Sequence, residues 1–182
     1  LRRLSFPFFP NEPMRSNRFT DFAGPAGAVF AVGAIFAAAL RSPTFSPTHS
    51  ALSDLGAAPG TAALFNGGLL AGAVVGAAYA LALRRHSTVV AVGYALALLA
   101  MALVGLFPAG TAPHFPSAIA FFLLATATVA VDGWRRRATP TGRLSLALVA
   151  AHVSGWLAWL GGVRPGPGLA LPELGGVVMF GV

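Results

Sequence analysis

The sequence FSPTHSALSDLGAAPGTAALFN, residues 45–66, is a polar stretch between two long apolar runs. It carries one acid (Asp54), one histidine (His49) and several hydroxyl groups, and it ends on Asn66, just inside the second run. Each run is long enough to cross the roughly 30 Å hydrocarbon core of a membrane as a helix. If both runs do so, the polar stretch is fixed at one membrane face, where any binding or chemistry would take place.

The composition also indicates a membrane protein. Of the 182 residues, 56% are hydrophobic and only 9% are charged, whereas a soluble domain carries about a quarter charged residues. So few charges cannot cover a water-facing surface, and we therefore expect lipid to cover it. The chain has no cysteine, which excludes disulfides, thiolate metal sites and cysteine nucleophiles.

The net charge of +7 comes from arginine alone, because the chain has no lysine. This bias is typical of a GC-rich genome. The arginines flank apolar runs instead of forming a stripe with interleaved aromatic residues, so we expect no nucleic-acid partner.

Charged and turn-forming residues divide the chain into membrane spans. We expect spans at 22–40, at 62–83, on either side of the turn 107–116, and at 144–163. A last apolar piece begins near Leu169 and ends at Val182, which is short for a crossing. The sequence therefore predicts an all-α polytopic transmembrane helical bundle of about six spans, the last one short or truncated.

The residues before the first span include three prolines among the first thirteen, so a helix is not expected there. We expect residues 1–21 to form a disordered cytoplasmic tail and residues 22–182 to form a single transmembrane domain. Met14 is a candidate for the true start of the protein, and the alternative is that the whole tail is genuine.

Arginines are concentrated in alternate connections, namely before the first span, after the second and after the fourth. The other connections carry only Arg41 and Arg164. Positive charge is retained in the cytoplasm, so we expect the N-terminus to lie inside. The stretch 45–66 and the turns 108–114 and 164–173 would then share the extracytoplasmic face.

Three connections bring candidate site residues to this face. We single out four as binding residues: Asp54, Asn66, His114 and Glu173. Imidazole and carboxylate groups could also hold a metal, with ligands drawn from His49, Asp54, His114 and Glu173. The catalytic candidates are Ser53, Asp54 and His114, with Ser53 as a nucleophile and His114 as its base. Neither His-Glu-x-x-His nor Gly-x-Ser-x-Gly is present, and the sequence names no cofactor.

These residues also have structural interpretations. Ser53 or Asp54 could cap a short interfacial helix or the second span, which is the commoner role of polar groups at helix ends. Asn66 could form a hydrogen bond to a neighbouring helix, as polar residues in membrane spans often do. His152, inside the fifth span, is a functional candidate by its depth, although a lone neutral histidine bonded to a backbone carbonyl is the commoner case.

Small residues recur at every fourth position of the second span, at Gly68, Gly72 and Gly76. Such a stripe lets another helix approach closely. We interpret it as packing within the chain in preference to a dimer face, and the oligomeric state stays open.

Several short motifs occur in a fixed order: Phe45-Ser-Pro, Leu-Ser-Asp-Leu-Gly56, Leu-Phe-Asn66 and Gly-Leu-Phe-Pro108, followed by His114. This pattern resembles domain of unknown function family nine-nine-eight, which are small archaeal and bacterial membrane proteins with about six spans. The likeness covers most of the chain from Met14 onward, and the short last span departs from it. The family is distantly similar to the damage-regulated autophagy modulator group. The resemblance implies the fold and adds weight to Asp54, Asn66 and His114, but it implies no activity.

We expect a multi-pass protein of the cell membrane that binds a lipid headgroup or a small solute at its outer face, with membrane lipids as its partners. The alternatives are a membrane-embedded hydrolase, with or without a metal, and a small-solute transporter. A transporter would favour ionisable groups at the midplane and inverted repeats, and only His152 lies at such depth.

Overall fold

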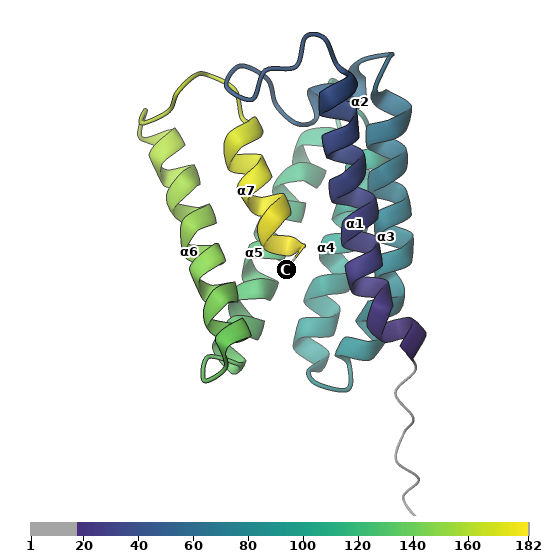
Figure 1. Cartoon of the computed structure of the whole chain (residues 1–182), viewed down its shortest axis with the longest axis vertical. Coiled ribbons are helices and arrows are strands. Elements are labelled where there is room, and N and C mark those ends of the chain that lie inside the picture. The colour runs from purple at the N-terminus through teal and green to yellow at the C-terminus, as the bar shows by residue number, and fades with distance from the viewer. Residues whose placement is uncertain (1–17, 182) are drawn as a thin grey trace, which may run out of the picture.

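The computed structural model describes residues 18–181, which form a bundle of helices (Figure 1). The five long helices are α1 (Arg18–Arg41), α3 (Ala62–Leu83), α4 (Thr88–Leu106), α5 (His114–Arg135) and α6 (Pro140–Leu160). Two shorter helices are α2 (Asp54–Ala57) and α7 (Ala170–Phe180). The described part of the chain contains no strand, and the predicted all-α class is confirmed.

The predicted span boundaries hold best where a turn is rich in glycine and proline. The second predicted span coincides with α3, and the turn 107–116 separates α4 from α5. α6 begins earlier than predicted because the Thr139 hydroxyl accepts a hydrogen bond from the Gly142 N–H at 3.1 Å, with Pro140 as the first helical residue. α1 likewise begins at Arg18, before the predicted start. The tail was predicted over residues 1–21, of which 18–21 belong to α1; residues 1–17, with Met14, lie outside the described part.

All five long helices are long and apolar enough to cross a membrane. Large apolar side chains lie on the outside of the bundle, where Leu40 is 89% exposed and Val74 is 75% exposed. So much outward apolar surface is expected only where lipid covers it. The chain is therefore a multi-pass membrane protein.

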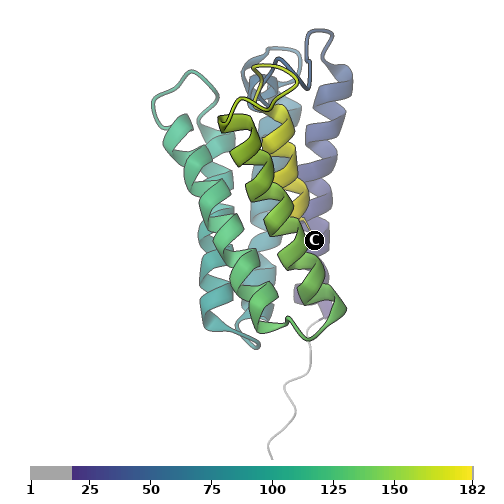
Figure 2. The same cartoon turned by 90° about the vertical axis from the view of Figure 1, so that its left-hand side faces the viewer.

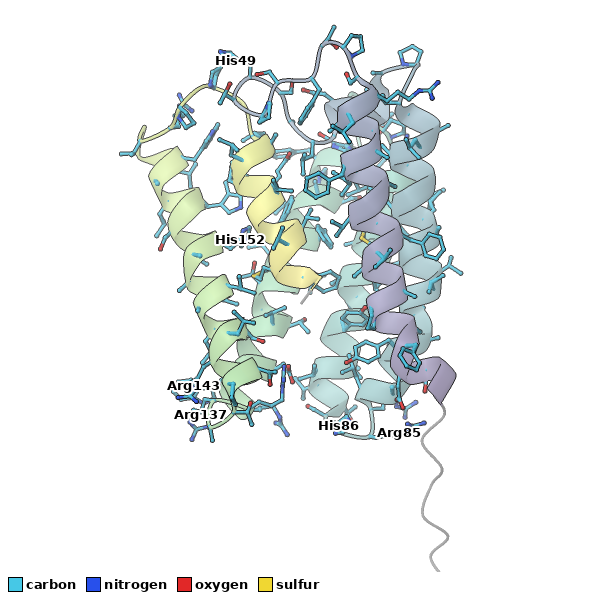
Figure 3. All side chains as sticks on the ribbon, in the orientation of Figure 1. His49, Arg85, His86, Arg137, Arg143 and His152 are labelled. Atoms are coloured by element: carbon cyan, nitrogen blue, oxygen red, sulfur yellow. The ribbon has the colours of Figure 1, made fainter. Side chains whose placement is uncertain are left out.

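The two ends of the bundle differ in charge. Arg85, His86, Arg137 and Arg143 lie together at one end, and His49 lies at the other (Figure 3). We call these the arginine-rich end and the His49 end. Their separation agrees with the alternation of arginines between successive connections, from which the cytoplasmic position of the N-terminus was predicted.

The glycine stripe of α3 packs mainly against α1. A Cβ atom added to Gly72 would lie 2.8 Å from the Ala31 Cβ and 2.8 Å from the Gly27 carbonyl oxygen, and one added to Gly68 would overlap Ala34. Only glycine lets the two backbones come this close. The stripe therefore makes a contact within the chain.

α7 descends from the His49 end between α6 and α1 and stops part-way along the bundle (Figures 1 and 2). Its inward face buries Pro172, Glu173, Gly176 and Met179. α6, in contrast, buries few residues and packs chiefly against α5 and α7. The packing of α7 onto α5 and α6 positions the candidate site.

Candidate functional site

The polar stretch 45–66 is tied to the segment that leads into α7. The N–H of Gly168 donates to the Thr48 carbonyl at 2.8 Å, and the N–H of Ala170 donates to the Ser50 carbonyl at 2.9 Å. A Cβ atom on Gly168 would lie 2.6 Å from the His49 carbonyl carbon, so only glycine allows this approach. The backbone of this stretch therefore pairs with the segment before α7.

Glu173 completes this connection from the first turns of α7. Its side chain is 8% exposed, and its Oε2 accepts a hydrogen bond from the Leu52 N–H at 2.6 Å. A carboxylate is costly to bury unless it is hydrogen-bonded, and this bond provides one partner. No hydrogen bond to the other carboxylate oxygen is found among the described residues.

Asp54 is engaged locally. Its Oδ2 accepts a hydrogen bond from the Ala51 N–H at 2.8 Å, and the side chain is otherwise exposed. It is the first residue of α2, where a negative charge favours the helix N-terminus. Ser53 precedes it at the N-cap position, but its hydroxyl makes no capping bond. The geometry thus gives Asp54 a structural role and leaves the Ser53 hydroxyl available.

Asn66 holds α2 against α3. Its Nδ2 donates to the Gly56 carbonyl at 2.9 Å, while its Oδ1 is buried without a partner. This contact matches the structural interpretation of Asn66. No hydrogen bond joins the Asn66 side chain to Glu173 or His114 within residues 18–181.

The His114 ring is oriented by the turn that precedes α5. Its Nδ1 lies 2.8 Å from the Phe107 carbonyl oxygen. A carbonyl can only accept, so Nδ1 carries the proton and Nε2 of the neutral ring is an acceptor. His49, by contrast, lies in the exposed loop with its Nδ1 2.8 Å from the Thr48 hydroxyl (Figure 3).

A groove of about 610 Å³ runs between α5 and α6, with α7 and Ser53 at its inner wall. Its walls are mostly apolar and include Phe115, Ile119, Leu123, Val153, Trp156 and Leu157. Five polar side chains line it, namely Ser53, His114, Thr126, His152 and Glu173, and the Thr126 hydroxyl donates to the Phe122 carbonyl of its own helix. We call this the α5–α6 groove, and it is the candidate site because it unites an apolar cavity with convergent polar groups.

Among the ionisable side chains that line the groove, His152 lies farthest from the His49 end (Figure 3). The residue is 5% exposed, and its ring lies between Phe122 and Trp156, with ring centroids 6.0 and 6.4 Å away. The Nδ1 atom is buried and makes no hydrogen bond. The sequence marked His152 by its depth alone. Its convergence with Glu173 depends on α7 packing onto α6 through Gly176, which no local pattern indicates.

The described part of the chain assembles neither a metal centre nor a hydrogen-bonded nucleophile–base pair. Within residues 18–181, no three histidine or carboxylate side chains gather closely enough to hold a metal ion. His49 and His114 belong to separate connections, and each bonds within its own. Ser53 and His114 line the same groove, but no hydrogen bond joins them in the described part of the chain.

Comparison with known proteins agrees with the fold but brings no activity. No curated protein and no solved structure is detectably similar to the chain. A family model described as protein of unknown function (DUF998) matches residues 25–182. This match covers α1 from its second turn, all the other helices and the whole α5–α6 groove. The resemblance inferred from the short motifs is thereby confirmed, and the chain belongs to the DUF998 family.

Proposed function

We propose that the protein binds a membrane lipid in the α5–α6 groove, with the lipid tail between the two helices and the headgroup beside Glu173. The observation that carries this proposal is the union of apolar walls with Ser53, His114, His152 and Glu173 in one cavity. The arginine alternation supports an extracytoplasmic position for the Glu173 end.

The groove is open to the side of the bundle. Leu123 and Leu157, which line it, are 66% and 64% exposed, so its walls continue into the surface that lipid covers. A small polar solute would gain little from these walls, whereas a hydrocarbon chain would be matched to them. The volume of about 610 Å³ lies within the range of about 300–1,000 Å³ common for ligand sites.

The alternatives have weaker support. A hydrolase would need an activated nucleophile, and the Ser53 hydroxyl has no hydrogen bond to His114. A transporter would need charged or polar groups near the midplane in two related halves, and His152 is the only ionisable group of the groove at such depth.

The test is a substitution that fills the groove with a larger side chain of the protein itself. Ala127 lines the groove on α5, and Ala127→Phe places a ring where the lipid tail would lie. The matched control is Val131→Phe, since Val131 is 40% exposed on the same helix but does not line the groove. Both variants should keep the helical circular dichroism and monodisperse elution of the parent.

Lipid that stays bound after extensive detergent washing is counted by mass spectrometry. We expect the parent and Val131→Phe to retain about one lipid per chain and Ala127→Phe to retain less than about a fifth of that, because a filled cavity excludes its ligand. Equal lipid content in Ala127→Phe and Val131→Phe would contradict the proposal.

A further inference from the structure

The polar groups of the α5–α6 groove are mainly hydrogen-bond acceptors. When ionised, the Glu173 carboxylate only accepts hydrogen bonds, and burial raises its pKa to about 7, so the neutral form, which also keeps an acceptor oxygen, is present near neutral pH. His114 uses its Nδ1–H on the Phe107 carbonyl, which leaves Nε2 as an acceptor. A ligand headgroup that supplies donors would therefore satisfy both side chains.

His152 adds a third side chain with hydrogen-bonding capacity. In the neutral form its ring has one nitrogen that donates and one that accepts. Because the residue is 5% exposed and Nδ1 makes no hydrogen bond, His152 has unused capacity beside the groove.

Positive charge is absent from the groove. Among its described lining residues there is no arginine. Arg164, the nearest candidate along the chain, lies over the Trp159 ring at 4.7 Å and lines a separate cavity with Thr48 and Gly166. Burial and, to a smaller extent, the nearby charge of Asp54 raise the pKa of Glu173, which shows that this end of the groove disfavours further negative charge. A headgroup with exposed anionic oxygens would meet acceptors and negative charge without a balancing cation.

We propose that the groove selects neutral lipids whose headgroup donates a hydrogen bond, in the simplest case a diacylglycerol with a free hydroxyl, and excludes phosphate-terminated lipids. This selectivity rests on the proposed lipid-binding function. Glu173 and His114 accept from the hydroxyl, and the Ser53 hydroxyl can either donate or accept. The acyl chains occupy the apolar part of the groove toward Leu123 and Leu157.

Tryptophan fluorescence can report lipid binding in the groove. Trp156 lines it, and Trp159 lies next to Trp156 with ring centroids 6.2 Å apart. Trp134→Phe removes the tryptophan at the arginine-rich end, so the remaining fluorescence comes from Trp156 in the groove and from Trp159 beside it. Brominated acyl chains quench tryptophan fluorescence on contact. Diacylglycerol with brominated chains is titrated into phosphatidylcholine nanodiscs that hold the Trp134→Phe protein.

Unbrominated lipids with identical acyl chains are then added as competitors, so that the affinities of different headgroups can be compared. We expect diacylglycerol to reverse the quenching at concentrations about tenfold lower than phosphatidic acid or diacylglycerol acetylated on its free hydroxyl, because each of these lacks the neutral donor. Equal competition by phosphatidic acid or by the acetylated lipid would overturn the selectivity but leave lipid binding intact. Quenching that never saturates with any lipid, and that is the same in Ala127→Phe, would overturn the proposed function as well.

Glu173→Gln tests the residue on which the selectivity depends most. Glutamine keeps an acceptor for the Leu52 N–H and the shape of the side chain, but it removes the charge and adds a donor. We expect the preference for diacylglycerol over phosphatidic acid to fall at least about threefold, with thermal stability close to the parent. An unchanged preference in this folded variant would count against the proposal.

Discussion

Two sets of polar side chains lie toward the His49 end, and they differ in what they bind. Asp54 and Asn66 are used by nearby backbone, through the Ala51 N–H and the Gly56 carbonyl. Glu173, His114 and His152 line a cavity and keep part of their hydrogen-bonding capacity unused. We call these the loop set and the groove set.

The difference follows from how each set is positioned. The loop set comes from residues close in sequence, and polar groups near helix ends usually satisfy backbone groups left free there. The groove set comes from three separate helices whose packing brings the side chains to one cavity. Changes in the loop set should therefore alter stability alone, and changes in the groove set should alter lipid binding. Three substitutions test this division, in order of expected effect.

Glu173→Ala should have the largest effect because Glu173 both supports the fold and lines the groove. The change leaves the buried Leu52 N–H without its acceptor, which costs about 1–3 kcal/mol of unfolding free energy. It also removes the proposed headgroup contact, so bound lipid should fall about tenfold. Thermal unfolding followed by circular dichroism and lipid mass spectrometry measure the two effects. Unchanged lipid content in the folded variant would put Glu173 in the loop set.

Asn66→Leu should lower the unfolding free energy by about 1 kcal/mol, because the Gly56 carbonyl loses its donor. The loss is limited, since the buried and unpaired Oδ1 is removed as well. Bound lipid should not change. A melting temperature lower than that of the parent together with normal lipid content is the expected result. Loss of lipid without loss of stability would show that Asn66 takes part in the site.

Asp54→Ala should have the smallest effect of the three. The exposed carboxylate satisfies one backbone N–H at the start of a short helix, and such caps contribute about 0.5–2 kcal/mol. We expect a value at the lower end and unchanged lipid content. Asp54→Asn keeps an acceptor and serves as the matched control. If both variants lose lipid equally, the negative charge of Asp54 acts on the groove and the division between the sets fails.

Much of the fold could be predicted from the sequence, because charges and prolines mark where apolar helices end. The bounds of α3 and the turn after α4 follow directly from Arg84, Phe107 and Pro108. The start of α6 was missed because Thr139 caps a helix inside a segment that reads as a loop. Such a cap depends on a single hydroxyl group, which is hard to recognise as a helix start in a stretch rich in arginine.

The candidate site could be predicted only in part. The alternation of spans predicts that His114 and Glu173 lie toward the same end of the bundle, and both line the α5–α6 groove. The pairing of the stretch 45–66 with α7 does not, since it depends on the close approach that Gly168 allows. The place of His152 in the groove depends in turn on where α7 packs. Both are properties of tertiary packing, and neither leaves a local signal in the chain.

The most direct test of lipid binding is a crystal structure grown in a lipid mesophase that contains diacylglycerol with brominated acyl chains. If lipid binds in the α5–α6 groove, the anomalous map will show bromine peaks between α5 and α6, near Leu123 and Leu157. Headgroup density is then expected within hydrogen-bonding distance of Glu173. A groove closed by its own side chains, or bromine peaks spread evenly around the bundle with none in the groove, would contradict lipid binding at this site.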